Sequence, residues 1–201
     1  MARKTKEEAE KTRQAIIEAA FIVLAKHGIA KTTLNKVALQ AGVTRGAIYW
    51  HFEDRDALFL ALSDLAMAPL LPIYKQLESS HGEELRHNLL MIATNMLESL
   101  LLDQQVQQLN RLSQQWATDK VFMDKYRPLH IERNEQFEGY LESLKVDGIL
   151  LPHLTPKTAC LIFTAFLSGI FEQWEVSNES LQVNDIPEVI KSLDKALFVD
   201  G

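Results

Sequence analysis

The stretch from Thr33 to Phe52, TLNKVALQAGVTRGAIYWHF, carries the strongest structural pattern in this sequence. Its first part places apolar side chains at positions i, i+3, i+4 and i+7, which share one face of a short helix: Leu34, Val37, Ala38 and Ala41. Thr33 is a good N-cap for this helix, because its hydroxyl can accept a hydrogen bond from a backbone N–H of the first turn. Gly42 follows the last apolar position and suits the left-handed residue at which many helices end.

A second short helix is predicted from Thr44 to Phe52. Thr44 is again an N-cap residue, and Ile48 and Phe52, four positions apart, give this helix its buried side. Two short capped helices joined by a glycine-containing turn predict a helix-turn-helix.

The remaining side chains of the second helix are more polar and aromatic than a small core requires. They are Thr44, Arg45, Gly46, Tyr49, Trp50 and His51. Such a helix can enter the major groove of DNA, where its N-terminal residues meet base edges, while hydroxyl groups and helix N-termini suit phosphate oxygens. The alternative is a helical pair that only packs, because the spacing alone is moderately specific.

Charge is distributed unevenly along the chain. The formal net charge is −6, yet residues 1–55 contain ten Lys/Arg and six Asp/Glu, whereas residues 56–201 contain eleven and twenty-one. A basic end on an acidic body is expected if only that end contacts nucleic acid, although a mixed solvated surface is the alternative. Arg3, Lys4 and Lys6 suit either an arm that contacts DNA or a solubilising tail.

The residues AGVTRGAIYWHFEDRDALF resemble the DNA-binding signature of the TetR family of bacterial transcription regulators. The opening MARKTKEEAEKTRQAIIEAA, together with TTL and VTRGAIYWHF, is similar to the AcrR-like branch, whose members repress multidrug efflux pumps. The resemblance implies a three-helix DNA-binding head at residues 1–54 and a helical ligand-binding and dimerisation body at residues 55–201.

The rest of the chain shows helical periodicity and no strand pattern, so an all-α fold of about nine helices is predicted. Asp54 is the expected cap of the fourth helix, which Pro69 and Pro72 should kink or break because proline lacks an N–H and clashes with the preceding turn. The helices expected after it are residues 83–102, 104–116, 119–146, 156–176 and 186–199.

Catalysis, a metal site and a resident cofactor are not indicated. The six histidines show no metal-ligand spacing, and the sequence has no H-E-x-x-H, G-x-S-x-G or glycine-rich phosphate loop. Cys160, the single cysteine, is expected to be a small core residue. No secretory signal is apparent and no apolar run approaches the ~18 residues of a membrane span, so we expect a cytoplasmic protein without membrane contact.

The family resemblance also implies a pocket for a small lipophilic ligand in the body. Apolar walls with a few polar groups are typical of such pockets. The residues nominated on that basis are Met67, Asn95, Met96, Trp116, Tyr126, His130, Arg133, Phe137 and Phe166. Arg133 is the strongest candidate, because it takes an apolar position of its helix, where a buried charge needs a partner such as a ligand or Glu98. Each nominated residue could instead belong to the ordinary core or surface.

The last two helices resemble the dimerisation face of the family. Their surplus of apolar residues needs cover, which a two-fold dimer supplies. The predicted interface residues are Phe163, Ile170, Trp174, Val189, Ile190, Leu193 and Leu197.

The expected function is a homodimeric repressor that binds a pseudo-palindromic operator in double-stranded DNA and is released by a lipophilic ligand. Thr44 and Arg45 would read base edges, and Gly46 would allow close approach. The residues expected at the phosphates are Thr33, Tyr49, His51 and Arg55. The alternatives are a TetR-like DNA-binding protein without an inducer, acting through protein partners or in chromosome organisation, and an enzyme or helical interaction module without DNA function.

Overall fold

The computed structural model describes residues 6–67, 71–116, 120–177 and 180–200. Within these ranges the chain forms ten α-helices and two short 3₁₀ helices, and the β contact found there is a single bridge between Leu150 and Phe198. The predicted all-α fold is confirmed. The chain divides into two compact units, one drawn from residues 1–68 and 108–126 and the other from residues 69–107 and 127–201.

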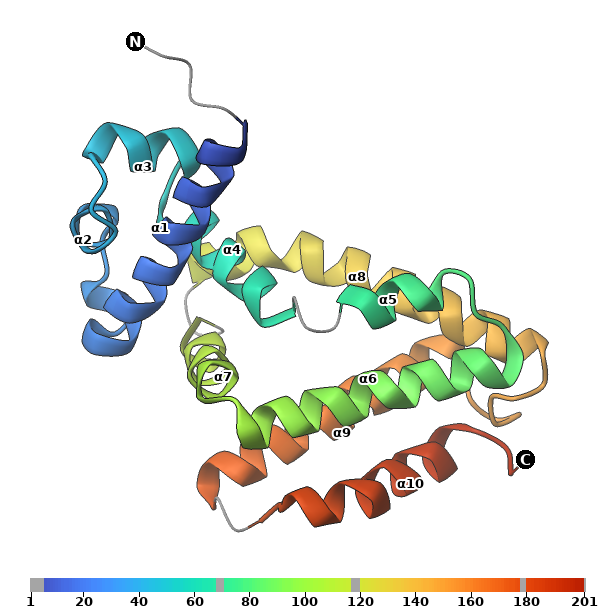
Figure 1. Cartoon of the computed structure of the whole chain (residues 1–201). Helices are drawn as coiled ribbons and strands as arrows, with labels where there is room; N and C mark the ends of the chain where they lie inside the picture. The colour runs from blue at the N-terminus through green and yellow to red at the C-terminus, as the bar shows by residue number, and fades with distance from the viewer. Residues whose placement is uncertain (1–5, 68–70, 117–119, 178–179, 201) are drawn as a thin grey trace. The chain divides into compact units, whose positions relative to one another are not determined.

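Unit 1 contains the helices of the predicted head and one more. They are α1 (Lys6–His27), the 3₁₀ helix η1 (Ile29–Lys31), α2 (Leu34–Gln40), α3 (Arg45–His51) and α4 (Arg55–Met67). The end of α7 (Gln104–Trp116) and the start of α8 (Lys120–Val146) also belong to it. In Figure 1 the blue helix α1 packs against α2 and α4, and α2 packs against α3.

The core of unit 1 is built from the apolar stripe of each helix. Ile16 of α1, Val37 of α2, Ile48 of α3 and Leu58 of α4 are fully buried in one cluster. Burying one such aliphatic side chain contributes about 1.5–3 kcal/mol, so a seven-residue helix such as α3 is held by tertiary packing.

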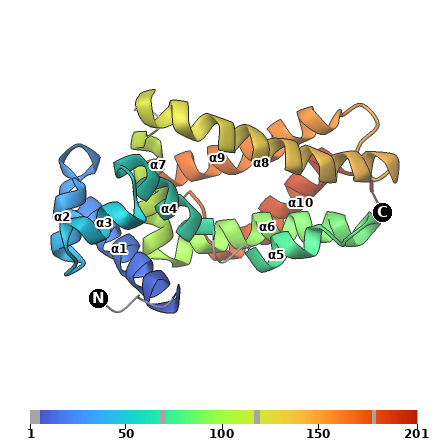
Figure 2. The same ribbon diagram turned by 90° about the horizontal axis from the view of Figure 1, so that it is seen from above.

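Unit 2 is a helical bundle. Its complete helices are α5 (Leu71–Leu77), α6 (Gly82–Leu102), α9 (Pro156–Val176) and α10 (Ile186–Leu197), with the 3₁₀ helix η3 (Val183–Asp185) before the last. Helix α6 lies alongside α5, α9 and α10, an arrangement that Figure 2 shows from above. Leu89, Ile92 and Leu97 of α6 are fully buried in the cluster that also contains residues of α9 and α10.

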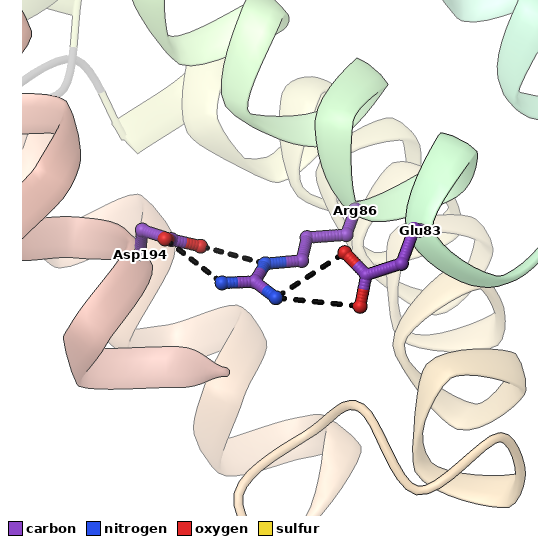
Figure 3. A network of polar contacts seen from close by, with 3 residues as sticks. All are labelled: Glu83, Arg86 and Asp194. Atoms are coloured by element: carbon purple, nitrogen blue, oxygen red, sulfur yellow. Dashed lines mark hydrogen bonds and ion pairs between the residues drawn. The ribbon is translucent and has the colours of Figure 1, made fainter. Parts of the chain in front are cut away.

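An ion-pair network joins two helices of unit 2 that are far apart in the sequence (Figure 3). The Arg86 guanidinium on α6 donates through Nε and Nη2 to the two carboxylate oxygens of Asp194 on α10, at 2.8 and 2.9 Å. Its Nη1 donates to Glu83 at 3.2–3.4 Å. These carboxylates raise the pKa of Arg86, so the guanidinium stays charged at any working pH.

The described residues contain ten α-helices where about nine were predicted, because α4 and α5 occupy the stretch predicted as the fourth helix. Helix α4 ends at Met67 and α5 begins at Leu71. Pro72 lies in the first turn of α5, where its missing N–H needs no partner within the helix. The kink or break expected at the prolines falls on residues 68–70, which lie outside the described residues. Pro69 lies outside the described residues, as do Arg3 and Lys4 of the predicted arm.

Helix α9 is the described segment most similar to a membrane span, although its uncharged apolar run stays short of ~18 residues, as the sequence predicts. Its 21 residues have the length and mean hydropathy of such a span, and within the described ranges it alone meets these two criteria. Its buried residues, among them Ala159, Phe163 and Leu167, belong to the core of unit 2. Core helices of bundles satisfy the same two criteria, so length and mean hydropathy alone do not make α9 a membrane span.

Candidate nucleic-acid interface

The turn between α2 and α3 forms as the sequence predicts. The backbone N–H of Lys36 donates to Thr33 Oγ1 at 3.3 Å, and that of Ala47 donates to Thr44 Oγ1 at 3.1 Å, so both threonines cap their helices. Gly42 has a φ of 66°, which is the left-handed conformation that favours glycine. Local hydrogen bonds thus define where α2 and α3 begin, and the Gly42 conformation follows the end of α2.

Helix α3 is anchored by few residues and exposes the others. Ile48 is completely buried and Phe52, its C-cap, is 3% exposed. Tyr49 is 46% and Trp50 71% exposed, which is unusual for side chains of this size. Thr44, Arg45 and Gly46 at the start of the helix are exposed as well, and His51 is half-buried. The residues of this helix that are predicted to contact DNA are therefore exposed, apart from His51.

Ring contacts order the exposed side chains of α3. The Arg45 guanidinium lies over the Tyr49 ring, 5.6 Å from its centroid, and the Trp50 and His51 rings meet edge to face at 4.5 Å. A Cβ at Gly46 would meet no other atom of the described chain closer than Thr44 Oγ1 at 4.0 Å. Packing inside the chain thus does not require a glycine at this position.

The start of α4 adds a further cation to this surface. Asp54 caps the helix as predicted, because its Oδ1 accepts from the Ala57 N–H at 2.8 Å. Arg55 follows, with Nε 3.6 Å from Asp56 Oδ1 and its guanidinium 5.3 Å from the centre of the Phe59 ring. The Arg55 side chain is 34% exposed, so part of it is held by the protein and part faces water.

Sequence reasoning missed three residues around α3 and α4. Arg13 of α1 lies over the Phe52 ring at 5.4 Å, and Lys125 of α8 contacts Asp54. Leu39 of α2 is 85% exposed, a large apolar side chain in water. The exposure of Leu39 could have been predicted from the sequence, since Leu39 lies outside the apolar face of its helix. The contacts of Arg13 and Lys125 join segments that are distant in the sequence, so no local pattern predicts them.

The nine predicted ligand residues are divided between the two units. Met67, Trp116 and Tyr126 belong to unit 1 and the other six to unit 2. In unit 2, Met96, Phe137 and Phe166 are half-buried and pack against its core. Asn95 is half-buried, and its amide donates to the Met91 carbonyl at 2.7 Å.

The expectation that Arg133 is buried was wrong. Arg133 and His130 are exposed, as is the whole run of α8 from residue 127 to residue 133. Even Leu129 is 43% exposed. The helix packs into the core of unit 2 only from Phe137 onward, so the apolar periodicity in this part of α8 does not correspond to burial within its unit.

The residues predicted for the dimer interface fall into two groups. Phe163, Trp174, Leu193 and Leu197 are at most 5% exposed and belong to the core of unit 2, so they are corrected to core residues of a single chain. The reason is that α6 covers this side of α9 and α10. Ile170, Val189 and Ile190 are half-buried, and Leu161 and Val176 of α9 are 65% and 80% exposed.

The described residues form an all-α protein with a helix-turn-helix whose second helix presents cationic and aromatic side chains outward, as in a DNA-binding regulator. A family model described as "Bacterial regulatory proteins, tetR family" matches residues 16–62. The transcriptional repressor BepR of Brucella suis is 30% identical over 176 residues, covering 86% of this chain and 84% of its own length. The chain belongs to the TetR family.

Two further relatives cover nearly the whole chain. The transcriptional regulator AcrR of Shigella flexneri is 29% identical over 191 residues, covering 91% of this chain and 87% of its own. SmeT, the repressor of the Stenotrophomonas maltophilia multidrug efflux pump SmeDEF, was solved with triclosan. That structure has a TM-score of 0.77 and 23% identity, covering 95% of this chain and 93% of its own.

Proposed function

We propose that this protein is a homodimeric repressor of a multidrug efflux pump operon, released from its operator by a small lipophilic ligand. The proposal is supported by the relatives AcrR, BepR and SmeT, the last of which is described as an efflux-pump repressor. Its place of action would be the cytoplasm, where the operator is. A DNA-binding member of the family without an inducer is the outcome to be distinguished by experiment.

The observation that carries the DNA-binding role is the outward face of α3. Arg45 and Thr44 stand at the start of the helix and would meet base edges in the major groove. Gly46 would let the backbone approach the duplex closely, which accounts for a glycine that internal packing does not require.

The phosphate contacts would come from the rim of the same surface. The residues proposed for them are Thr33, Tyr49, His51 and Arg55, each exposed or half-buried, and Trp50 is proposed as a further DNA contact of α3. Arg55 donates in a fixed planar geometry, which suits a phosphate oxygen pair. Because Phe59 and Asp56 already hold its guanidinium, little side-chain entropy would be lost when it binds.

The DNA-binding role is tested with a duplex selected from random sequence by the wild-type protein. Arg45→Ala should weaken specific binding by about 1–3 kcal/mol, because a bidentate contact to a guanine is worth that much. Arg127→Ala is the matched control, since Arg127 is exposed but lies in the other unit. Unchanged affinity of Arg45→Ala in a fluorescence-anisotropy titration would remove Arg45 from the interface.

The ligand and dimer parts of the proposal are tested separately. A thermal-shift screen of lipophilic compounds, beginning with triclosan, should find at least one that raises the melting temperature and releases the duplex. If no compound does so, the inducer-free alternative stands. Sedimentation should show a dimer whose formation is weakened by Leu161→Asp, because this exposed apolar side chain of α9 would be covered by the second copy.

A further inference from the structure

Lys125 of α8 contacts two carboxylates at the start of α4. Its ammonium donates to Asp54 Oδ2 and lies 3.5 Å from Asp56 Oδ2. All three residues belong to unit 1, although Lys125 follows Asp54 by 71 positions in the sequence. One long-range contact therefore fixes the first turn of α4.

Each carboxylate oxygen of Asp54 accepts a hydrogen bond. Its Oδ1 accepts from the Ala57 N–H and so caps α4, while Oδ2 accepts from Lys125. The Lys125 hydrogen bond is also the main reason why the pKa of Asp54 is lowered. A charged carboxylate is thus maintained at the helix start, where it also interacts favourably with the helix dipole.

Arg55 stands between Asp54 and Asp56 in the sequence, and it contacts the second of these carboxylates. Asp56 is 8% exposed, and one of its oxygens lies 3.6 Å from Arg55 Nε while the other faces Lys125. The position of Arg55 therefore depends on neighbours that Lys125 holds. Phe52, the C-cap of α3, precedes Asp54 by only two positions, so this group is close to the end of α3 in the sequence.

We propose that Lys125 is a positioning residue for DNA binding, which acts through Asp54 and Asp56 to hold Arg55 in the orientation that binds a phosphate. The inference rests on the proposed DNA-binding role of Arg55 and adds a residue that need not touch DNA. Lys125 is exposed enough to be replaced without opening the core, since 45% of its side chain faces solvent.

A purely electrostatic role of Lys125 predicts a different effect of Asp54→Asn on DNA affinity. If its charge only attracts the duplex, Asp54→Asn removes a repulsive charge and strengthens DNA binding. If Lys125 positions Arg55 through Asp54, the same substitution weakens binding. Asparagine is a good N-cap, so Asp54→Asn keeps the hydrogen bond from Ala57 and removes mainly the ion pair.

The experiment measures the dissociation constant of the full-length protein on its selected duplex by fluorescence anisotropy. We expect Lys125→Met and Asp54→Asn each to weaken binding about two- to fivefold, the range typical of an exposed ion pair. The double variant should bind no more weakly than Lys125→Met alone, because that substitution already removes the contact to Asp54. Lys125→Arg should restore most of the affinity.

Two further variants separate the positioning of Arg55 from a loss of positive charge and from a loss of fold stability. Lys11→Met is the matched control, since Lys11 is an exposed lysine of unit 1 paired with Glu7 at 2.8 Å; it gives the loss expected from charge alone. In an Arg55→Met background, Lys125→Met should have no further effect beyond that loss. A residue that only stabilises the fold would still weaken binding there, and circular dichroism and thermal unfolding would show the lost stability.

The inference is overturned if Asp54→Asn binds as tightly as the wild type or more tightly, or if Lys125→Met loses no more than Lys11→Met. It is also overturned if the two substitutions add, or if their effect persists without Arg55. Should Lys125→Met fail to fold, the affinities of Asp54→Asn and Lys125→Arg still test the inference: the first should bind DNA more weakly than the wild type, and the second almost as tightly. If the wild-type protein selects no duplex, the proposed function fails.

Discussion

Replacing Arg86 tests the contact that ties α6 to α10 in unit 2. The guanidinium makes two parallel charge-assisted hydrogen bonds to Asp194 at 2.8 and 2.9 Å, and its side chain is 12% exposed (Figure 3). It also lies over the Phe198 ring at 5.5 Å. Arg86→Met keeps an unbranched apolar stem in the same place and removes the charge, so the loss reports mainly the polar contacts.

The expected cost of Arg86→Met is about 3 kcal/mol in the free energy of unfolding. Hydrogen bonds to charged groups contribute about 1.5–3 kcal/mol, and the Phe198 contact adds about 0.5–1 kcal/mol. Asp194 is 25% exposed, so water reaches the carboxylate once its partner is gone and the cost stays below that of a fully buried broken pair. For a chain of this length the melting temperature should fall by roughly 6–12 °C.

Glu83 supplies the matched control for this prediction. Its side chain is 66% exposed and only one Arg86 nitrogen contacts it, so Glu83→Gln should cost less than about 0.5–1 kcal/mol. Urea unfolding followed by circular dichroism should be repeated at several protein concentrations, because dimer dissociation would make the midpoint concentration-dependent. Equal losses for Arg86→Met and Glu83→Gln would refute the assignment of the main contribution to Asp194.

The remaining predictions concern a turn, a thiol and a titrating carboxylate. Gly42→Ala should lower stability by about 1 kcal/mol in urea unfolding, because φ is 66° there, whereas Gly139→Ala in the interior of α8 should be neutral or stabilising. Burial raises the pKa of the Cys160 thiol, so its reaction with a disulfide reagent at about pH 8 should be slow until the protein is unfolded. The pKa of Asp54 is lowered below 3.8, so its stabilisation is complete above about pH 5 and is lost as the pH falls through the folded value; the difference in urea midpoint between wild type and Asp54→Asn should shrink accordingly.

The helix-turn-helix could be predicted because its signals are local. Thr33 and Thr44 each accept a hydrogen bond from a backbone N–H three residues later, and Gly42 takes a positive φ one residue after the C-cap. Each signal involves residues within four positions of one another. Such contacts follow from the chain's own covalent geometry and need no knowledge of the tertiary structure.

The outward face of α3 could be predicted for a related reason. A seven-residue helix needs few residues for anchoring, and Ile48 together with Phe52 suffices. Tyr49 and Trp50 were then left without a place in the core, which made exposure the expected outcome. Large aromatic side chains that remain in water are costly, so their exposure favours a binding role over a purely structural one.

The ion pairs that organise α4 and α10 could not be predicted from the sequence. Arg86 and Asp194 are 108 positions apart, and Lys125 and Asp54 are 71 apart. Each of these residues is an ordinary charged position on a helix surface. Which cation meets which carboxylate depends on how the helices pack, and a single sequence carries no signal for that pairing.

The periodic apolar stripes had a different shortcoming, because a stripe shows which side chains avoid water but not what covers them. On α9 and α10 the side chains of Phe163, Trp174 and Leu193 suit a dimer interface as well as a core, yet they are buried in the core that α6 and α8 also form within one chain. The periodicity on α8 likewise extends through Leu129, which is 43% exposed in its unit. A second copy or a ligand can therefore act only on apolar surface that the chain itself leaves open, such as Leu161 and Val176. This uncovered remainder, and not the total apolar content of a helix, is the quantity that an interface prediction requires.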